Sequence, residues 1–194
     1  MRKVIFIFTK QTQTQIKYLS ILVLLSLNVF CGQTQIVKRN IPEKLVILTF
    51  DDATASQYSV VAPLLIKYGF GATFFICEFP PNFADSSKYM NWRQIKELDR
   101  MGFEIANHTH THAHVSKLTS NNLLSQIEYI EHKCDSLHIN KPVSFAYPGY
   151  DLNLQAIKVL QEKRYCFARA GGSRAYDPKK DHPMLIPSWA GCPI

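Results

Sequence analysis

Side chains able to do chemistry are concentrated in two short segments of this sequence. Asp51 and Asp52 are adjacent and follow the apolar run 45–50, while segment 107–115 (NHTHTHAHV) contains four of the seven histidines. Two neighbouring carboxylates are difficult to remove from water together unless they share a cation. Two histidines four residues apart on a helical turn point to one side and can hold one ion. Together the segments favour a metal site of one carboxylate and two histidines, which leaves a coordination position open for catalysis.

Each segment also has a simpler interpretation. An Asp-Asp pair by itself is typical of a turn or a helix cap, and a histidine-rich tract by itself can bind metal loosely. The spacing does not select one histidine pair, because His108 and His112 are four residues apart and so are His110 and His114. The metal site is therefore predicted from the two segments in combination.

From residue 45 onward, short apolar runs alternate with amphipathic helical patterns. Strands are predicted at 45–50, 71–77, 103–108, 143–149 and 165–170. Helices are predicted at 59–69, 92–102, 120–138 and 152–164. This alternation predicts an α/β fold with parallel strands joined by helical crossovers. In such folds chemistry gathers at the carboxyl ends of the strands, where Asp51 and His108 fall.

The composition is that of one globular domain without a polyanionic partner. The chain has 194 residues, 46% of them hydrophobic, which suits a single core. Part of its formal charge of +7 comes from residues 1–32, which hold four basic residues and no acidic one. The 18 basic and 15 acidic residues that follow are nearly balanced, so no nucleic-acid partner is predicted.

Residues 1–32 are typical of an export signal. The uncharged, mostly apolar run 18–31 follows a basic segment and is too short to span a membrane comfortably. We expect a signal peptide cleaved near residue 32, with a retained segment or a lipid anchor on Cys31 as the alternative. The protein is thus predicted to be exported to the periplasm, the cell envelope or the medium, and to contact a membrane only through an uncleaved or lipidated leader.

The remainder is predicted to consist of a linker, 33–44, and one domain, 45–194. Four cysteines follow the leader and allow three disulfide pairings, among which the sequence does not choose. Each is more typical of a small buried side chain than of a reactive group.

Three segments carry a resemblance to a known family. TFDDA (49–53), PLLIKYGFGATFFI (63–76) and IANHTHTHAHVSKL (105–118) resemble the polysaccharide deacetylase family, the NodB-homology group of carbohydrate esterases. The resemblance extends from residue 45 to about residue 171. It implies a distorted, seven-stranded relative of the TIM barrel. Only five strands are predicted here, so the barrel is expected to be incomplete at the C-terminus.

The family motifs imply roles for both segments. By motif, Asp52, His108 and His112 are implied to be ligands of a divalent metal ion, zinc by default. Asp51 is implied to be the catalytic base, and His110 and His114 would be bystanders. In this chemistry the ion polarises the acetyl carbonyl and lowers the pKa of water, from which the base takes a proton.

A third family motif resembles FAYPGY (145–150). The match implies substrate contacts from Tyr147, Pro148 and Gly149, with the Gly149 amide as the oxyanion donor. An aromatic residue at position 147 is equally typical of packing. Ala146 stands where many members have an arginine that braces the base, and Arg169, at the end of the fifth predicted strand, is a candidate replacement.

The resemblance implies a metal-dependent hydrolase that removes acetyl groups from a polysaccharide or peptidoglycan-type amino sugar. N-acetyl groups are expected, and O-acetyl groups fit the same chemistry. Two alternatives remain: a carbohydrate-binding member of the fold that has lost turnover, and a protein that sequesters metal with its histidine tract.

Family members carry a later motif whose histidine protonates the leaving amine. The only late histidine here, His182, lies in a predicted loop (KKDHP) that is more typical of a solvated segment. A chain lacking this acid is expected to bind metal but to deacetylate slowly. It is also expected to leave a strand edge exposed.

Overall fold

Five parallel strands form one sheet in the order in which they occur in the chain. The computed structural model describes residues 45–79 and 82–189. The predicted leader, the linker and Cys192 lie outside the described residues. The strands are β1 (Thr49–Asp51), β2 (Thr73–Ile76), β3 (Glu104–Asn107), β4 (Ser144–Ala146) and β5 (Phe167–Arg169). Every neighbouring pair is parallel, as the alternation of strands and helices predicted.

Four α-helices connect these strands. They are α2 (Ala62–Tyr68), which continues a π-helical segment (Gln57–Val61), α3 (Trp92–Arg100), α4 (Ser120–Ser136) and α5 (Leu154–Glu162). Three of them begin at a side chain that accepts a hydrogen bond from a backbone N–H of the first turn: Asn91, Thr119 and Asn153. None of the described helices is long and apolar enough to cross a membrane.

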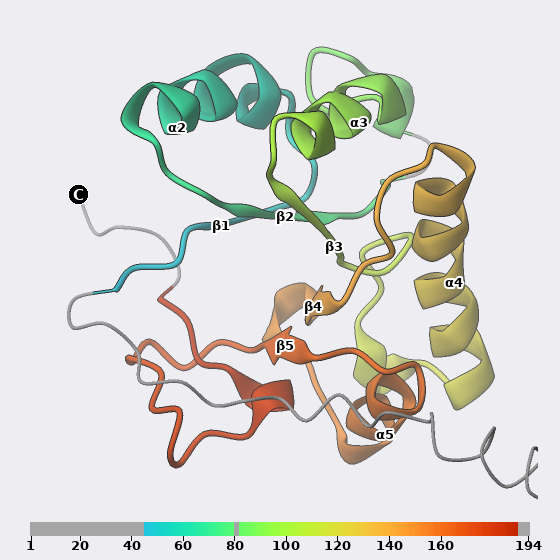
Figure 1. Ribbon diagram of the computed structural model, residues 1–194. Helices are drawn as coiled ribbons and strands as arrows, with labels where there is room; N and C mark the ends of the chain where they lie inside the picture. The colour runs from blue at the N-terminus through green and yellow to red at the C-terminus, as the bar shows by residue number, and fades with distance from the viewer. Residues whose placement is uncertain (1–44, 80–81, 190–194) are drawn as a thin grey trace, which may run out of the picture. The chain divides into compact units, whose positions relative to one another are not determined.

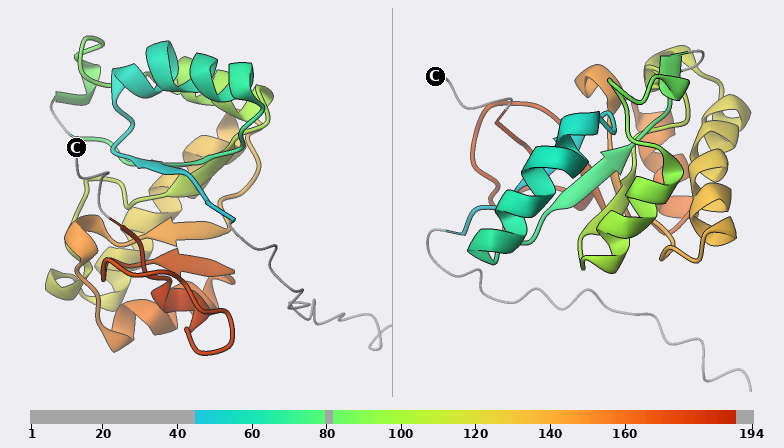
Figure 2. Two further views of the ribbon diagram at one scale, coloured as in Figure 1. Left: turned by 90° about the vertical axis from the view of Figure 1, so that its left-hand side faces the viewer. Right: turned by 90° about the horizontal axis from the view of Figure 1, so that it is seen from above.

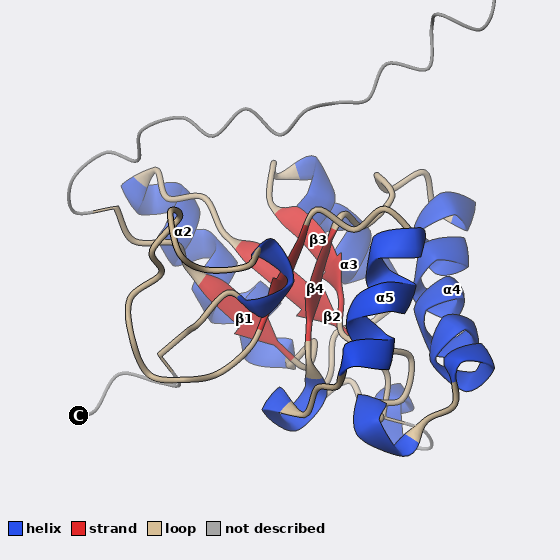
Figure 3. Ribbon diagram, turned by 90° about the horizontal axis from the view of Figure 1, so that it is seen from below, coloured by secondary structure: helices blue, strands red, loops and turns tan. Residues whose placement is uncertain are grey.

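The helices lie outside a curved sheet. Figure 1 shows α2 and α3 over β1–β3, α4 beside the middle of the sheet and α5 below β5. The side and top views in Figure 2 and the view from below in Figure 3 show the same arrangement. The five strands therefore curl into part of a barrel, which confirms the predicted α/β class and its incomplete barrel.

The core has two main parts, and α4 contributes to both. One part packs α2 and α3 against β2 and β3, with Phe74, Ile95 and Leu98 fully buried. The other packs α5 against β4 and β5, around Phe145 and Leu160. Helix α4 supplies Ile130 and Cys134 to the first part, and Leu123 and Ile127 to the second. The long helix thus holds the two halves of the curved sheet together.

The first strand is shorter than predicted. β1 begins at Thr49, and the side chains at 45, 46 and 47 are 54%, 75% and 72% exposed. The prediction of a buried strand from residue 45 was wrong because β1 is an edge strand, paired only with β2 among the described residues. Apolar residues there lack the neighbours that burial needs.

The opposite edge is better covered than predicted. Ile186 forms a parallel bridge with Arg169, accepts a hydrogen bond from the N–H of Ala170 and donates to the carbonyl of Ala168. The segment after the short 3-10 turn Pro183–Leu185 thus runs along β5. Within the described ranges, the unpaired edge of the sheet is therefore that of β1, while β5 is partly protected.

Candidate active site

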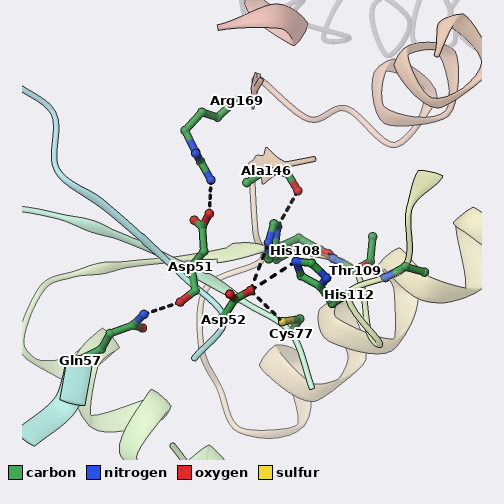
Figure 4. Close-up of polar contacts among 11 residues, drawn as sticks. Asp51, Asp52, Gln57, Cys77, His108, Thr109, His112, Ala146 and Arg169 are labelled. Carbon is green, nitrogen blue, oxygen red and sulfur yellow. Dashed lines mark hydrogen bonds and ion pairs between the residues drawn. The ribbon is translucent and has the colours of Figure 1, made fainter. Parts of the chain in front are cut away.

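The predicted site residues come from the carboxyl ends of four strands. Asp51 ends β1, Asn107 ends β3, Ala146 ends β4 and Arg169 ends β5. Because all the strands are parallel, these ends lie on one edge of the sheet. Figure 4 shows the side chains from these ends converging there.

Asp52, His108 and His112 form one cluster. Asp52 Oδ1 lies 3.4 Å from His108 Nε2 and 3.5 Å from His112 Nε2. One ligand atom from each residue lies within 4.8 Å of the others. His108 is fully buried, whereas Asp52 and His112 are partly exposed. The cluster therefore has a buried side and a side open to solvent, as a site that must admit a substrate requires.

The hydrogen bonding of His108 tests whether this cluster suits a cation. Its Nδ1 lies 2.8 Å from the carbonyl oxygen of Ala146, so Nδ1 must carry the proton and donate it. In the neutral ring Nε2 is then an acceptor, and it faces the carboxylate oxygen of Asp52. Two acceptors at this distance repel each other unless a cation lies between them, either a proton on Nε2 or a metal ion. The cluster thus fits a metal ion, and Ala146 fixes the required tautomer of the ligand.

The surroundings of Asp52 and His112 shift their pKa values toward the forms that bind metals. Burial alone raises the pKa of Asp52, but the hydrogen bond and charge of His108, together with His112 and Cys77, lower it below its usual value. The pKa of His112 is lowered, chiefly by burial and then by His108. An ionised carboxylate and a neutral imidazole are the forms that coordinate metals.

The histidine segment is a loop rather than the helical turn on which the spacing argument relied. Thr109 and His112 both have positive φ, 62° and 54°. Asn107 holds the start of the loop by accepting from the N–H of Thr109 at 2.9 Å and donating to the carbonyl of Ile127 at 3.0 Å. The two left-handed residues turn His112 back toward His108, with ring centres 4.9 Å apart.

The other two histidines point elsewhere. His110 Nε2 lies 3.3 Å from Glu78 Oε2, and its ring stacks on Tyr129 at 3.4 Å. His114 is exposed, with Nδ1 3.8 Å from Asp151 Oδ2. Neither belongs to the Asp52 cluster, although both lie in the same tract.

Asp51 has a different environment from Asp52. Its Oδ2 lies 2.5 Å from Nη2 of Arg169, which is 9% exposed. The guanidinium carbon lies 5.2 Å from the ring centroid of Phe75 and 5.8 Å from that of Tyr150. Asp51 Oδ1 is buried and has no hydrogen-bond partner among the described residues. Arg169 therefore holds one oxygen of this carboxylate, as its candidate role predicted, and leaves the other able to accept a proton.

Only one of the three predicted substrate contacts on the turn after β4 is exposed. Tyr147 is 1% exposed, and its hydroxyl donates to the carbonyl of Met184 at 3.1 Å. Pro148 is buried as well, whereas Gly149 is exposed. Tyr147 packs into the second part of the core, which favours the packing alternative for this residue, and the predicted substrate contacts of Tyr147 and Pro148 stay predictions. Gly149 has φ 61°, and a Cβ there would lie 2.6 Å from Cε1 of His114, so the position requires glycine.

The structure places two further residues in contact with Asp51 and Asp52, and the sequence patterns did not indicate either of them. The Gln57 amide donates to the backbone carbonyl of Asp51. The Cys77 thiol donates to Asp52 Oδ1 at 3.7 Å, and burial raises the pKa of this thiol far above the ordinary value. Gln57 lies in a polar run and Cys77 in an apolar run, and neither belongs to a motif that predicts chemistry. No sequence signal therefore identifies them.

The late histidine has a structural contact. His182 is exposed and its Nδ1 accepts from the N–H of Met184 at 3.1 Å, which caps the short turn beside β5. This agrees with the prediction that it lies on a solvated loop.

A family model described as polysaccharide deacetylase matches residues 38–168. The chain is 29% identical to the peptidoglycan-N-acetylglucosamine deacetylase of Bacillus cereus, over 63% of this chain and 54% of that protein. It is 36% identical to the bifunctional xylanase/deacetylase of Pseudobutyrivibrio xylanivorans, over 45% of this chain and 14% of that protein. The chain spans about half or less of the length of the curated relatives it matches.

The fold is also that of solved deacetylases. The Streptococcus pyogenes deacetylase PplD, solved in complex with acetate, superposes with a TM-score of 0.67 at 19% identity, covering 78% of this chain and 66% of that one. At this identity the likeness concerns the fold, and the family model carries the assignment. The chain belongs to the polysaccharide deacetylase family.

Proposed function

We propose that this protein is a metal-dependent hydrolase that removes acetyl groups from a polysaccharide or peptidoglycan-type amino sugar. N-acetyl groups are the expected target, with O-acetyl groups accessible to the same chemistry. The observation that carries the proposal is that two adjacent carboxylates have different surroundings. Asp52 faces two histidines, whereas Asp51 faces Arg169 and keeps one buried oxygen without a hydrogen-bond partner in the described part of the chain.

Asp52, His108 and His112 would hold the metal ion. When bound, a divalent ion such as zinc supplies a Lewis acid that polarises the acetyl carbonyl and lowers the pKa of water toward ~7. Asp51 accepts the proton of the attacking water at Oδ1, while Arg169 holds Oδ2 and fixes the plane of the carboxylate. The exposed amide of Gly149, on the turn supported by Tyr147 and Pro148, is the proposed donor to the developing oxyanion.

Acetate release from acetylated chito-oligosaccharides tests the proposal. The chain with zinc is expected to release acetate, and chelation followed by re-addition of zinc is expected to abolish and restore the release. Binding of the oligosaccharides without acetate release under any metal condition would instead indicate a carbohydrate-binding member without turnover. More than one zinc ion per chain, without oligosaccharide binding, would favour metal sequestration.

Arg169→Gln is expected to lower kcat by about 10- to 100-fold, because the carboxylate of Asp51 loses the cation that orients it. KM and zinc affinity should stay close to those of the wild type, since Arg169 does not contact the Asp52 cluster. Arg169→Lys keeps the charge and is expected to recover part of the loss. Steady-state kinetics and zinc calorimetry on the three proteins separate these effects. A parallel loss of zinc affinity would contradict a positioning role.

A further inference from the structure

An exposed tyrosine that the family motifs do not assign lies beside the Asp51–Arg169 pair. Tyr150 follows the turn after β4 and is 41% exposed. The Arg169 guanidinium carbon lies 5.8 Å from the centre of its ring, and the same guanidinium binds Asp51. The ring is therefore separated from the proposed base by one guanidinium group.

The chain holds this ring in place at two positions. Tyr150 itself has φ 56°, a left-handed conformation that non-glycine residues rarely adopt. Its N–H donates to the carbonyl of Tyr147 at 3.0 Å, which closes the turn. Underneath, Gly171 lies against the ring, where a Cβ would be 2.9 Å from Cγ of Tyr150. The backbone conformation of Tyr150 and the close contact with Gly171 together fix the position of this ring.

Burial in the core does not account for the position of this ring. The core at this end of the sheet takes Tyr147, which is buried, while Tyr150 leaves much of its ring in solvent. Backbone strain of this kind clusters at sites that bind ligands. An exposed tyrosine ring combines a large apolar face with a polar tip, and that face suits the C–H face of a sugar ring.

We propose that Tyr150 is a specificity-determining residue that stacks on the sugar unit next to the one losing its acetyl group. The inference rests on the proposed function. The reason is position: the reacting acetyl group must lie between Asp51 and the metal ligands, and the Tyr150 ring contacts the Arg169 guanidinium that binds Asp51. A ring beside this pair is expected to contact the neighbouring unit of a polymer or oligomer, which a single sugar lacks.

The test compares Tyr150→Asn, which removes the ring but tolerates a left-handed backbone, with Tyr150→Phe, which keeps the ring. Gly171→Ala is a second, independent variant, because its Cβ displaces the ring while Tyr150 stays in the sequence. Tyr68→Asn is the matched control: Tyr68 is also an exposed tyrosine, but it ends α2 and leads into the amino end of β2. Thermal unfolding checks that each variant folds.

Binding of acetylated chitopentaose and of the monosaccharide is measured by calorimetry, and acetate release is measured in parallel. Tyr150→Asn and Gly171→Ala are expected to weaken pentamer binding by about 3- to 10-fold and to leave monosaccharide binding nearly unchanged. Tyr150→Phe and Tyr68→Asn should bind the pentamer as the wild type does.

Two outcomes would overturn the inference: unchanged pentamer affinity in Tyr150→Asn, or no measurable binding of the pentamer to the wild type. Pentamer binding that depends on Tyr150 in a wild type releasing no acetate would instead contradict the proposed function and leave the stacking role standing. The two proposals therefore fail separately.

Discussion

Asp51→Asn is expected to lower turnover by about 100-fold or more while the chain keeps its affinity for zinc. An amide cannot accept the proton of the attacking water, yet it has nearly the shape of the carboxylate and can still accept a hydrogen bond from Arg169. Asp51 does not belong to the cluster of Asp52, His108 and His112, so the metal ligands are untouched. Acetate release measures the turnover, and calorimetry with zinc measures the affinity.

The matched control is the same change at the neighbouring position. Asp52→Asn is expected to lose zinc affinity together with turnover, since an amide oxygen is a weaker ligand than a carboxylate. If Asp51→Asn lost the metal and Asp52→Asn kept it, the roles of the two aspartates would be exchanged. Turnover near the wild-type level in Asp51→Asn would show that another group takes the proton.

His108→Ala is expected to weaken zinc binding by more than about 100-fold and to abolish zinc-dependent acetate release. The histidine is buried, its Nδ1 is engaged with Ala146, and its Nε2 faces Asp52, so the change removes one of the three proposed ligands. His112→Ala is also expected to weaken zinc binding and to lower zinc-dependent acetate release. Zinc calorimetry gives the affinity, and circular dichroism checks that the variants fold.

The histidine tract provides its own controls. His110→Ala and His114→Ala remove imidazoles from the same loop, but these rings face Glu78 and Asp151 rather than Asp52. Both variants should keep zinc affinity within a few-fold of the wild type. Suppose instead that the 110 and 114 changes lowered zinc affinity as much as the 108 and 112 changes do. The tract would then bind metal through the other histidine pair, or through all four histidines.

The fold class could be predicted from the sequence because its signals are local. Apolar runs between amphipathic patterns predicted all five strands and four α-helices in the correct order, and parallel pairing follows from the helical crossovers. The boundaries of β1 could not be predicted this way. A run such as 45–50 is apolar whether or not a second strand lies beside it, and the exposure of 45–47 depends on whether a neighbour packs there, which none of the residues that the structure describes does.

For the site, the sequence by itself determined which residue types are available and at which strand ends they fall. Asp51 and Asp52 after the first strand, and the histidines after the third, must meet at one sheet edge in a parallel fold, and the motif resemblance selected His108 and His112. The meeting of the two segments follows from the order of elements along the chain alone, whereas the choice of the histidine pair needs the motif.

Only the tertiary structure decided what each group contacts. It placed Arg169, 118 residues from Asp51 in the chain, against that carboxylate, and it buried Tyr147 while leaving Tyr150 exposed. It also brought His112 to Asp52 through a left-handed loop instead of a helical turn. The physical reason is that side-chain direction at a strand end depends on the turn that follows and on the neighbours packed against it. Those neighbours come from distant parts of the chain, so no local pattern records them.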